Sequence, residues 1–163
     1  MDDYTVHCEY PSGHKVVTAE VSHVDHIATN MRKADTIEVE LMGYTPETAL
    51  LNALKLDYET FTVLDDKDVP YAMFGCGKGL EGYYIWMLGT DDVQKNRREF
   101  IKYSRKWVHG FVGIYEKVYN YVHIDNLLAV RWLRWCGAEM SPIIDFKGYK
   151  ICKFEIHKEN LCV

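Results

Sequence analysis

The sequence lacks several features that would assign it to a broad class of proteins at once. It has five cysteines among 163 residues, an odd number, and none of them forms a C-x-x-C pair. This usage fits a reducing compartment better than a disulfide framework. No apolar run approaches the roughly 20 residues that a membrane-spanning helix needs. Residues 1–8 are acidic and lack an apolar core, so we expect no signal peptide.

Metal-ligand spacing and an excess of positive charge are missing too. His23 and His26 could share one helix face, but no further ligands follow at a suitable spacing, so we predict no metal site. The formal net charge is -5, from 19 Lys and Arg against 24 Asp and Glu. Dedicated nucleic-acid-binding domains usually have a basic balance, so we do not expect nucleic acid as a partner.

What is present indicates one globular domain. Hydrophobic residues make up 48% of the chain and aromatic residues 13%, enough for a substantial core at this length. No repeat or linker divides the sequence. We therefore predict a single domain over residues 1–163, in which residues 1–20 form an N-terminal arm or an edge strand.

Hydrophobic periodicity predicts helices early in the chain and strands later. Residues 33–43 fit either a helix or a strand, and we favour the helix. The predicted elements are a strand over 15–21, helices over 23–32, 33–43 and 45–56, strands over 60–64, 69–75 and 83–88, a helix over 91–110, a strand over 118–122, a helix from 126 to 137, and a hairpin over 143–157. Hairpins and helix crossovers together predict an α+β fold, a mixed central sheet flanked by helices.

The stretch from Tyr119 to Ala138 organises this prediction. It reads as a strand, a cap at Asp125 or Asn126, and a helix that ends at Gly137. Leu128, Trp132 and Trp135 repeat at helical spacing, and Ala129 and Leu133 lie beside them on one apolar stripe, so we expect this face of the helix to pack inward.

Three further segments have an ordinary structural interpretation. The glycine-rich stretch 75–82 leads from strand to strand, so we expect a flexible loop and not a phosphate cradle. Cys136 has no histidine base in sight and is expected to be a packed thiol. The basic face of helix 91–110 is expected to be solvated, although binding of nucleic acid by a regulator is an alternative. That face consists of Lys95, Arg97, Arg98, Lys102, Arg105 and Lys106.

The order of elements resembles the GNAT (Gcn5-related N-acetyltransferase) fold. Asn126, Ala129 and Gly137 stand where that superfamily has Asn, Ala and Gly after its fifth strand. Two earlier segments, residues 30–35 (Asn-Met-Arg-Lys-Ala-Asp) and 45–50 (Thr-Pro-Glu-Thr-Ala-Leu), look like GNAT-like proteins of tailed bacteriophages. That group includes the internal virion protein A family of short-tailed phages.

The resemblance implies a place for acetyl-CoA and shows a departure from it. The superfamily binds the pyrophosphate at an Arg/Gln-x-x-Gly-x-Gly/Ala loop before its long helix. Here the segment 88–97 has one glycine, and Asp91 and Asp92 lie at the helix start. If acetyl-CoA binds, the residues expected to hold it are Leu88, Gln94, Lys95, Arg97 and Asn126.

The resemblance also implies acid–base groups that are partly missing. The strand over 83–88 has no carboxylate, and the acid that usually protonates the thiolate, a tyrosine seven residues after the Asn, is Leu133 here. Glu81 and Tyr121 are the remaining catalytic candidates.

We therefore expect a bacteriophage GNAT-like protein without catalysis or cofactor, acting as a virion-associated or host-interacting accessory protein. Its partner would be a protein of phage or host origin, met in the host cytoplasm or the virion. The alternative is an acetyl-CoA-dependent N-acetyltransferase with an altered phosphate-binding loop.

Overall fold

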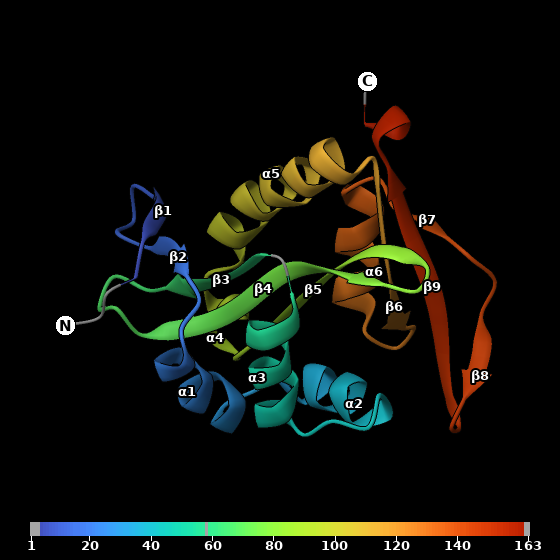
Figure 1. The fold of residues 1–163 in the computed structure, drawn as a ribbon, viewed down its shortest axis with the longest axis horizontal. Coiled ribbons are helices and arrows are strands. Elements are labelled where there is room, and N and C mark those ends of the chain that lie inside the picture. The colour runs from blue at the N-terminus through green and yellow to red at the C-terminus, as the bar shows by residue number, and fades with distance from the viewer. Residues whose placement is uncertain (1–3, 58, 162–163) are drawn as a thin grey trace. The chain divides into compact units, whose positions relative to one another are not determined.

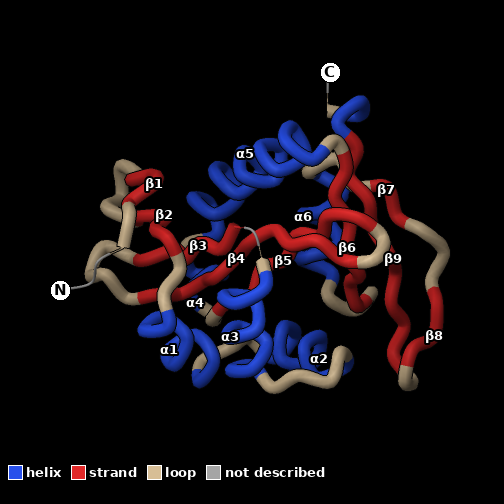
Figure 2. Tube along the Cα trace, in the orientation of Figure 1, coloured by secondary structure: helices blue, strands red, loops and turns tan. Residues whose placement is uncertain are grey.

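The computed structural model describes residues 4–57 and 59–161. Figure 1 traces the chain, and Figure 2 separates its helices from its strands. The strands are β1 (Val6–Glu9), β2 (Lys15–Thr18), β3 (Glu59–Leu64), β4 (Pro70–Gly79), β5 (Gly82–Gly89), β6 (Lys117–His123), β7 (Glu139–Met140), β8 (Ile144–Phe146) and β9 (Tyr149–His157). The helices are α1 (Val24–Thr29), α2 (Lys33–Leu41), α3 (Pro46–Leu56), α4 (Asp92–Lys95), α5 (Arg97–Tyr115) and α6 (Leu127–Trp135).

The predicted α+β arrangement is confirmed. In the described residues, nine strands form one mixed sheet in the order β1-β2-β3-β4-β5-β6-β9-β7, and β8 pairs with β9 beside this path. β5 and β6 are parallel and meet at one residue pair, Tyr84 with Tyr119. The parallel pair follows from the helical crossover between these two strands. No helix in the described part is long and apolar enough to span a membrane.

The chain divides into two compact units. The first comprises Met1–Gly77 and Trp86–Asn96, and the second comprises Lys78–Ile85 and Arg97–Val163. The core of the first unit gathers apolar side chains from α1, α2, α3, β4 and β5, with Ile27, Leu50 and Met73 fully buried. Within the segment predicted as an arm or edge strand, β1 lies at one end of the strand order, and residues 1–3 lie outside the described part.

Local sequence signals placed several helix ends correctly. Residues 33–41 form a helix, as favoured over a strand. α3 begins after Thr45, whose hydroxyl accepts from the Thr48 N–H at 3.2 Å. The Asn126 side chain accepts from the Ala129 N–H at 3.4 Å and caps α6, and Gly137 follows that helix with a φ of +100°. Each signal acts through neighbouring backbone groups, which the sequence specifies directly.

The glycine-rich loop predicted over residues 75–82 is wrong. β4 continues through Gly79, and β5 begins at Gly82, so only a tight turn at Leu80 and Glu81 remains. A Cβ on Gly75 would lie 2.3 Å from the Glu59 carbonyl oxygen of β3. The glycine is therefore present because two strands approach closely, and not because the chain is flexible there.

The single helix predicted over residues 91–110 is two helices. α4 ends at Lys95, Asn96 separates it from α5, and α5 continues to Tyr115. The Asn96 side chain donates to the Asp92 carbonyl oxygen at 2.9 Å, which satisfies a carbonyl at the end of α4.

The expected inward face of α6 is only partly buried. Leu128 is 54% exposed and Trp135 is 44% exposed, so these two residues of the predicted stripe do not pack in the core. Leu133 is buried, and the Trp132 ring contacts Phe100 of α5 with centroids 5.7 Å apart. The helix therefore packs along Trp132 and Leu133, while Leu128 and Trp135 of the predicted stripe are exposed.

Candidate functional site

The junction after β5 is the place where the resemblance would put a phosphate-binding loop. Gly89, at the end of β5, donates its N–H to Asp35 Oδ2 at 2.9 Å and accepts from the Arg32 N–H at 2.9 Å. Asp35 is only 2% exposed and also accepts two bonds from the Arg32 guanidinium, at 3.0 and 2.9 Å. The end of the strand is thus tied to the start of α2, inside the first unit.

The following N–H groups are engaged within the chain as well. The Thr90 N–H donates to the Tyr71 carbonyl at 2.9 Å, and the Asp92 N–H donates to the Thr90 hydroxyl at 3.3 Å. Further donations, each to an oxygen two to four residues earlier, come from the N–H groups of Val93, Gln94, Lys95 and Asn96. A phosphate cradle needs N–H groups that point at the ligand. Between Gly89 and Asn96, seven of eight such groups already have acceptors.

The predicted cofactor residues fall into both units. In the first unit, Leu88 is buried in the core, and Gln94 and Lys95 are exposed. The Lys95 ammonium lies 2.6 Å from Asp92 Oδ1, and this hydrogen bond raises the pKa of Lys95. In the second unit, Arg97 is exposed at the first position of α5, and Asn126 serves as the cap of α6.

One signal in this segment was missed in the sequence. Starting the loop motif at Gln94 places Arg97 and Glu99 at its two glycine positions. Glycine is needed there because the backbone must approach the phosphates closely, and both substitutes have long charged side chains. The start of α5 at Arg97 makes this alignment evident, because the motif leads into the long helix.

The catalytic candidates meet at a polar ladder on one side of β6 and β9, to which Tyr121 belongs. Because side chains alternate along strands, residues opposite each other in register share a side of the sheet. The pairs on this side are Lys117 with His157, Tyr119 with Glu155, and Tyr121 with Lys153. The other side carries the buried Val118, Val122, Cys152 and Ile156.

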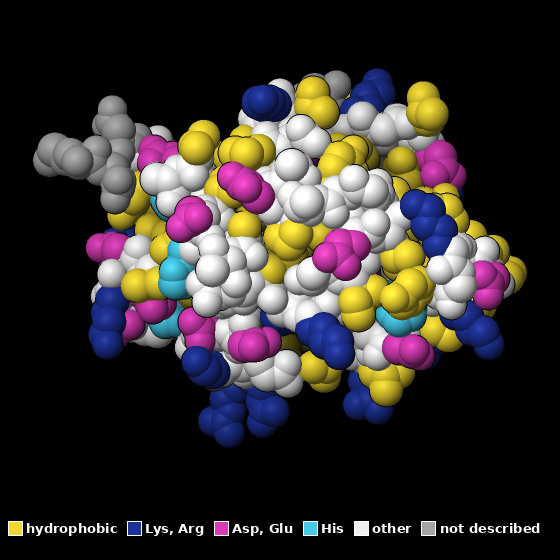
Figure 3. Space-filling model, turned by 90° about the horizontal axis from the view of Figure 1, so that it is seen from below, with side chains coloured by type: hydrophobic (Ala, Val, Ile, Leu, Met, Phe, Trp, Pro, Cys, Tyr) yellow, Lys and Arg dark blue, Asp and Glu magenta, His cyan; other side chains and the backbone are white. Residues whose placement is uncertain are grey.

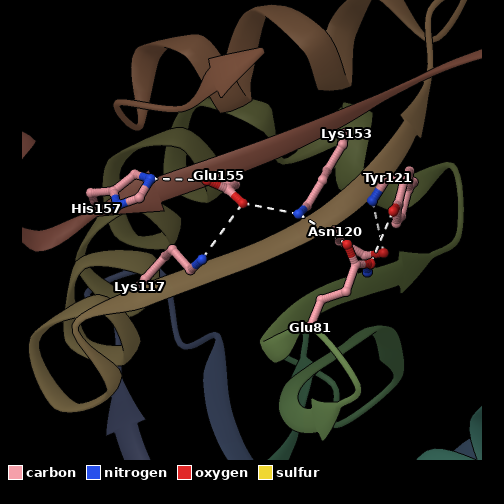
Figure 4. Close-up of polar contacts among 7 residues, drawn as sticks. All are labelled: Glu81, Lys117, Asn120, Tyr121, Lys153, Glu155 and His157. Carbon is pink, nitrogen blue, oxygen red and sulfur yellow. Dashed lines mark hydrogen bonds and ion pairs between the residues drawn. The ribbon is translucent and has the colours of Figure 1, made fainter. Parts of the chain in front are cut away.

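Glu81 contacts this ladder from the turn between β4 and β5 and lies beside Tyr121 (Figure 4). The Tyr121 hydroxyl donates to Glu81 Oε2 at 2.9 Å, and the Lys153 ammonium lies 3.1 Å from Glu81 Oε1 and 2.9 Å from Glu155 Oε1. Hydrogen bonds from Lys153 and Tyr121 lower the pKa of Glu81, and the bond to Glu81 raises the pKa of Tyr121. Both shifts oppose the proposed roles, since Glu81 becomes a weaker base and Tyr121 a weaker acid.

Leu133 occupies the position where the superfamily has the tyrosine that protonates the thiolate, and its neighbours do not offer a substitute acid. Leu133 is 5% exposed and packs as a core residue of the second unit. Tyr119 is buried at 7% exposure, and Tyr115 stacks on Tyr83 with centroids 4.2 Å apart. These tyrosines therefore have packing roles in the second unit.

Cys136 lies at the end of α6 and is fully buried. Burial raises the pKa of its thiol to about 12, and His109 Nε2 lies 3.1 Å from the Cys136 carbonyl oxygen, a backbone contact and not one with sulfur. Burial raises the pKa of Cys76 to about 12 as well. A nucleophilic cysteine needs the opposite shift.

We expect neither Cys76 nor Cys136 to react with DTNB in the native protein at pH 8, because both thiols are buried and protonated. Cys8, which is partly exposed, is the internal reference and should be labelled. The measurement is mass spectrometry of labelled peptides before and after unfolding in guanidinium, which should expose both thiols. Native labelling of Cys136 as fast as Cys8 would contradict the packed-thiol interpretation. Cys162 lies outside the described residues.

Comparisons with known proteins agree with this geometry at the level of the fold. A family model described as "Bacteriophage T7, probable scaffold protein Gp13" matches residues 63–142, from β3 to β7. No curated protein sequence matches the chain. The family match covers slightly less than half of the 163 residues, so it is a similarity over that segment.

Solved structures match almost the whole chain. A GNAT-family acetyltransferase from Bacillus anthracis has a TM-score of 0.67 at 11% identity, covering 95% of this chain and 99% of that one. Spermidine N-acetyltransferase from Vibrio cholerae, in complex with CoA and spermine, has a TM-score of 0.60 at 14% identity, covering 91% and 98%. Escherichia coli ribosomal-protein-S18-alanine N-acetyltransferase has a TM-score of 0.62 at 11% identity, covering 88% and 93%. At these identities the likeness establishes the fold alone: the chain has the fold of the GNAT acetyltransferases.

Proposed function

We propose that this chain is a bacteriophage protein that has the GNAT fold but does not transfer acetyl groups. It acts as an accessory protein, either associated with the virion or bound to a host protein. The phage assignment draws on the similarity of residues 63–142 to the T7 probable scaffold protein family and on the phage-like segments 30–35 and 45–50.

The observation that carries the non-catalytic proposal is the occupied junction after β5. The Gly89 N–H is held by Asp35, the Thr90 N–H is held by Tyr71, and the N–H groups from Asp92 through Asn96 have acceptors of their own. Arg97 and Glu99 replace the motif glycines, and Asp91 and Asp92 place negative charge near a pyrophosphate. Opening this junction would break the contact between α2 and β5 within the first unit.

Isothermal titration with acetyl-CoA is expected to show no binding up to 1 mM ligand, because long charged side chains occupy both motif glycine positions and seven of the eight N–H groups from Gly89 to Asn96 already have acceptors. Vibrio cholerae spermidine N-acetyltransferase, whose solved structure contains CoA, is the positive control in the same buffer. Titration with pantetheine, which lacks the pyrophosphate, tests whether any binding depends on that group. Micromolar binding of acetyl-CoA that is absent with pantetheine would overturn the non-catalytic proposal.

The accessory role has its own test. Mass spectrometry of purified particles of the encoding phage should detect the chain if it acts in the virion. If the particles lack it, affinity purification from infected cells should recover one host protein in stoichiometric amounts. Failure of both experiments would overturn the accessory role, whatever the titration shows.

One observation favours the alternative, an acetyl-CoA-dependent N-acetyltransferase. Glu81 and Tyr121 are 40 residues apart in the chain, yet they are hydrogen-bonded to each other beside the meeting point of β5 and β6. Such a pair could relay a proton from an amine if a substrate displaced Lys153. The pKa shifts of both groups weigh against this role in the observed arrangement.

A further inference from the structure

Charge is distributed very unevenly between the two compact units. In the sequence of the first unit, 6 Lys and Arg stand against 16 Asp and Glu, a net charge of -10. In the second unit, 13 stand against 8, a net charge of +5. The whole-chain value of -5 therefore conceals a basic unit. Charge asymmetry of this kind points to a polyanionic partner. Figure 3 views the structure from the side on which α1, α2 and α3 are drawn, where Asp and Glu side chains are scattered between hydrophobic ones.

The positive charge of the second unit is concentrated on α5 and α6. These two helices carry seven Lys or Arg and one acidic residue, Glu99. They lie side by side, because the Trp132 indole N–H donates to the Ser104 hydroxyl at 2.9 Å and the same ring contacts Phe100. We define the α5–α6 basic face as the exposed side chains Arg98, Lys102, Arg105, Lys106, Arg131 and Arg134.

None of these six cations has a carboxylate within 4.0 Å in the part of the chain that the structure describes. Other cations of the same unit are compensated: Lys117 and Lys153 contact Glu155, and Lys158 contacts Glu116. A solvated helix face usually mixes both signs, with oppositely charged residues three or four positions apart. The α5–α6 basic face has one sign only.

Aromatic rings are interleaved with these cations. The Arg105 guanidinium lies 4.6 Å from the ring centroid of Trp135, which is 44% exposed. The ammonium groups of Lys102 and Lys106 lie 5.1 and 5.7 Å from the ring of Tyr103. Unpaired cations beside an exposed ring are the combination by which proteins bind single-stranded nucleic acid, with phosphates on the cations and a base stacked on the ring. An acidic protein segment would need the cations but not the exposed indole.

We propose that the α5–α6 basic face binds single-stranded nucleic acid. Arg98, Lys102 and Lys106 follow each other along α5 at spacings of four residues, about 6 Å along the helix. Such a row can contact successive phosphates of one strand. Trp135, with Arg105 beside it, receives a base. This inference does not depend on the accessory role or on the lack of acetyl transfer, since no residue of the face belongs to the junction after β5.

The test is fluorescence anisotropy with a labelled 20-nucleotide oligo(dT), measured between 50 and 200 mM NaCl. The variant Arg98→Gln/Lys102→Gln/Lys106→Gln, which removes the row of phosphate contacts, should weaken binding at least tenfold at 50 mM NaCl. It should also reduce the slope of log K against log salt by about 2, since each phosphate contact to a single strand contributes about 0.7. The matched control is Lys33→Gln/Lys55→Gln/Lys67→Gln, which changes the net charge equally at exposed positions of the first unit. The control should bind like the wild type.

A second variant separates stacking from charge. Trp135→Ala should weaken binding of oligo(dT) at least fivefold and change binding of a 20-base-pair duplex less than twofold, because paired bases cannot stack on the ring. Equal losses of oligo(dT) affinity in the triple variant of the basic face and in its Lys33/Lys55/Lys67 control would overturn the assignment to α5 and α6. Displacement of oligo(dT) by poly-glutamate at equal charge concentration would overturn it in favour of an acidic protein partner. Circular dichroism of each variant verifies that the fold is retained.

Discussion

Replacement of Asp35 by alanine is expected to lower the free energy of unfolding by about 3 kcal/mol, the lower end for breaking a buried ion pair. The carboxylate is 2% exposed and accepts from both the Arg32 guanidinium and the Gly89 N–H. Its removal leaves a buried N–H without its acceptor and a cation without its partner. The lower end applies because the Arg32 side chain keeps 18% exposure and can be partly hydrated.

Urea unfolding followed by circular dichroism measures this loss. Asp66→Ala is the matched control, because Asp66 is exposed in the turn between β3 and β4 and its removal should stay within about 0.5 kcal/mol. The loss of unfolding free energy for Asp35→Asn should lie between those for Asp35→Ala and Asp66→Ala, since an amide oxygen can still accept from the Gly89 N–H. A loss below about 1 kcal/mol for Asp35→Ala would contradict the contact between α2 and the end of β5.

Gly75→Ala is the second large effect, with an expected loss of about 3 kcal/mol, the upper end for overpacking a filled site. The new Cβ would lie 2.3 Å from the Glu59 carbonyl oxygen and 3.3 Å from the Thr60 Cα. Both are backbone atoms of β3, so no flexible side chain can move aside. β3 and β4 would have to separate where Thr60 pairs with Gly75.

Gly110→Ala is the matched control and should change stability in the opposite direction. Gly110 lies inside α5, and a Cβ there meets no heavy atom within 4 Å. Alanine is favoured over glycine in a helix interior, so we expect a gain of about 0.5–1 kcal/mol. The same thermal or urea unfolding assay measures both variants. Equal tolerance at the two positions would mean that Gly75 and Cys76 do not pair with β3.

Helix caps and Gly75 show where prediction from the sequence succeeds and where it fails. Thr45, Asn126 and Gly137 were predicted correctly because a cap acts within a few residues of itself. The sequence around Gly75 predicts a loop, because the contact that requires a glycine there is with the backbone of Glu59, on another strand. Likewise, periodicity gave α6 an apolar stripe, but the position of α5 decided that Trp132 and Leu133 are the residues that pack.

At the candidate site, too, some features could be predicted from the sequence, and others depend on contacts between residues far apart in the chain. The residue types and spacing at Leu133, Asp91 and Asp92 were sufficient to show where the sequence departs from the pattern of the superfamily. The chain sequence could not show that Lys153 contacts Glu81, because 72 residues separate them and they lie on different elements, the turn between β4 and β5 and strand β9. Whole-chain net charge could not show the α5–α6 basic face either, since the excess of acids in the first unit outweighs it.

The bond between Gly89 and Asp35 makes one amide a reporter of local opening. The Gly89 N–H belongs to a strand, yet its acceptor is a side chain of α2. If α2 detached while the ladder between β3 and β4 stayed intact, this amide would exchange with solvent and those of β3 would not. The hydrogen-exchange rate of Gly89, compared with that of Val63 in β3, therefore measures the free energy with which α2 opens.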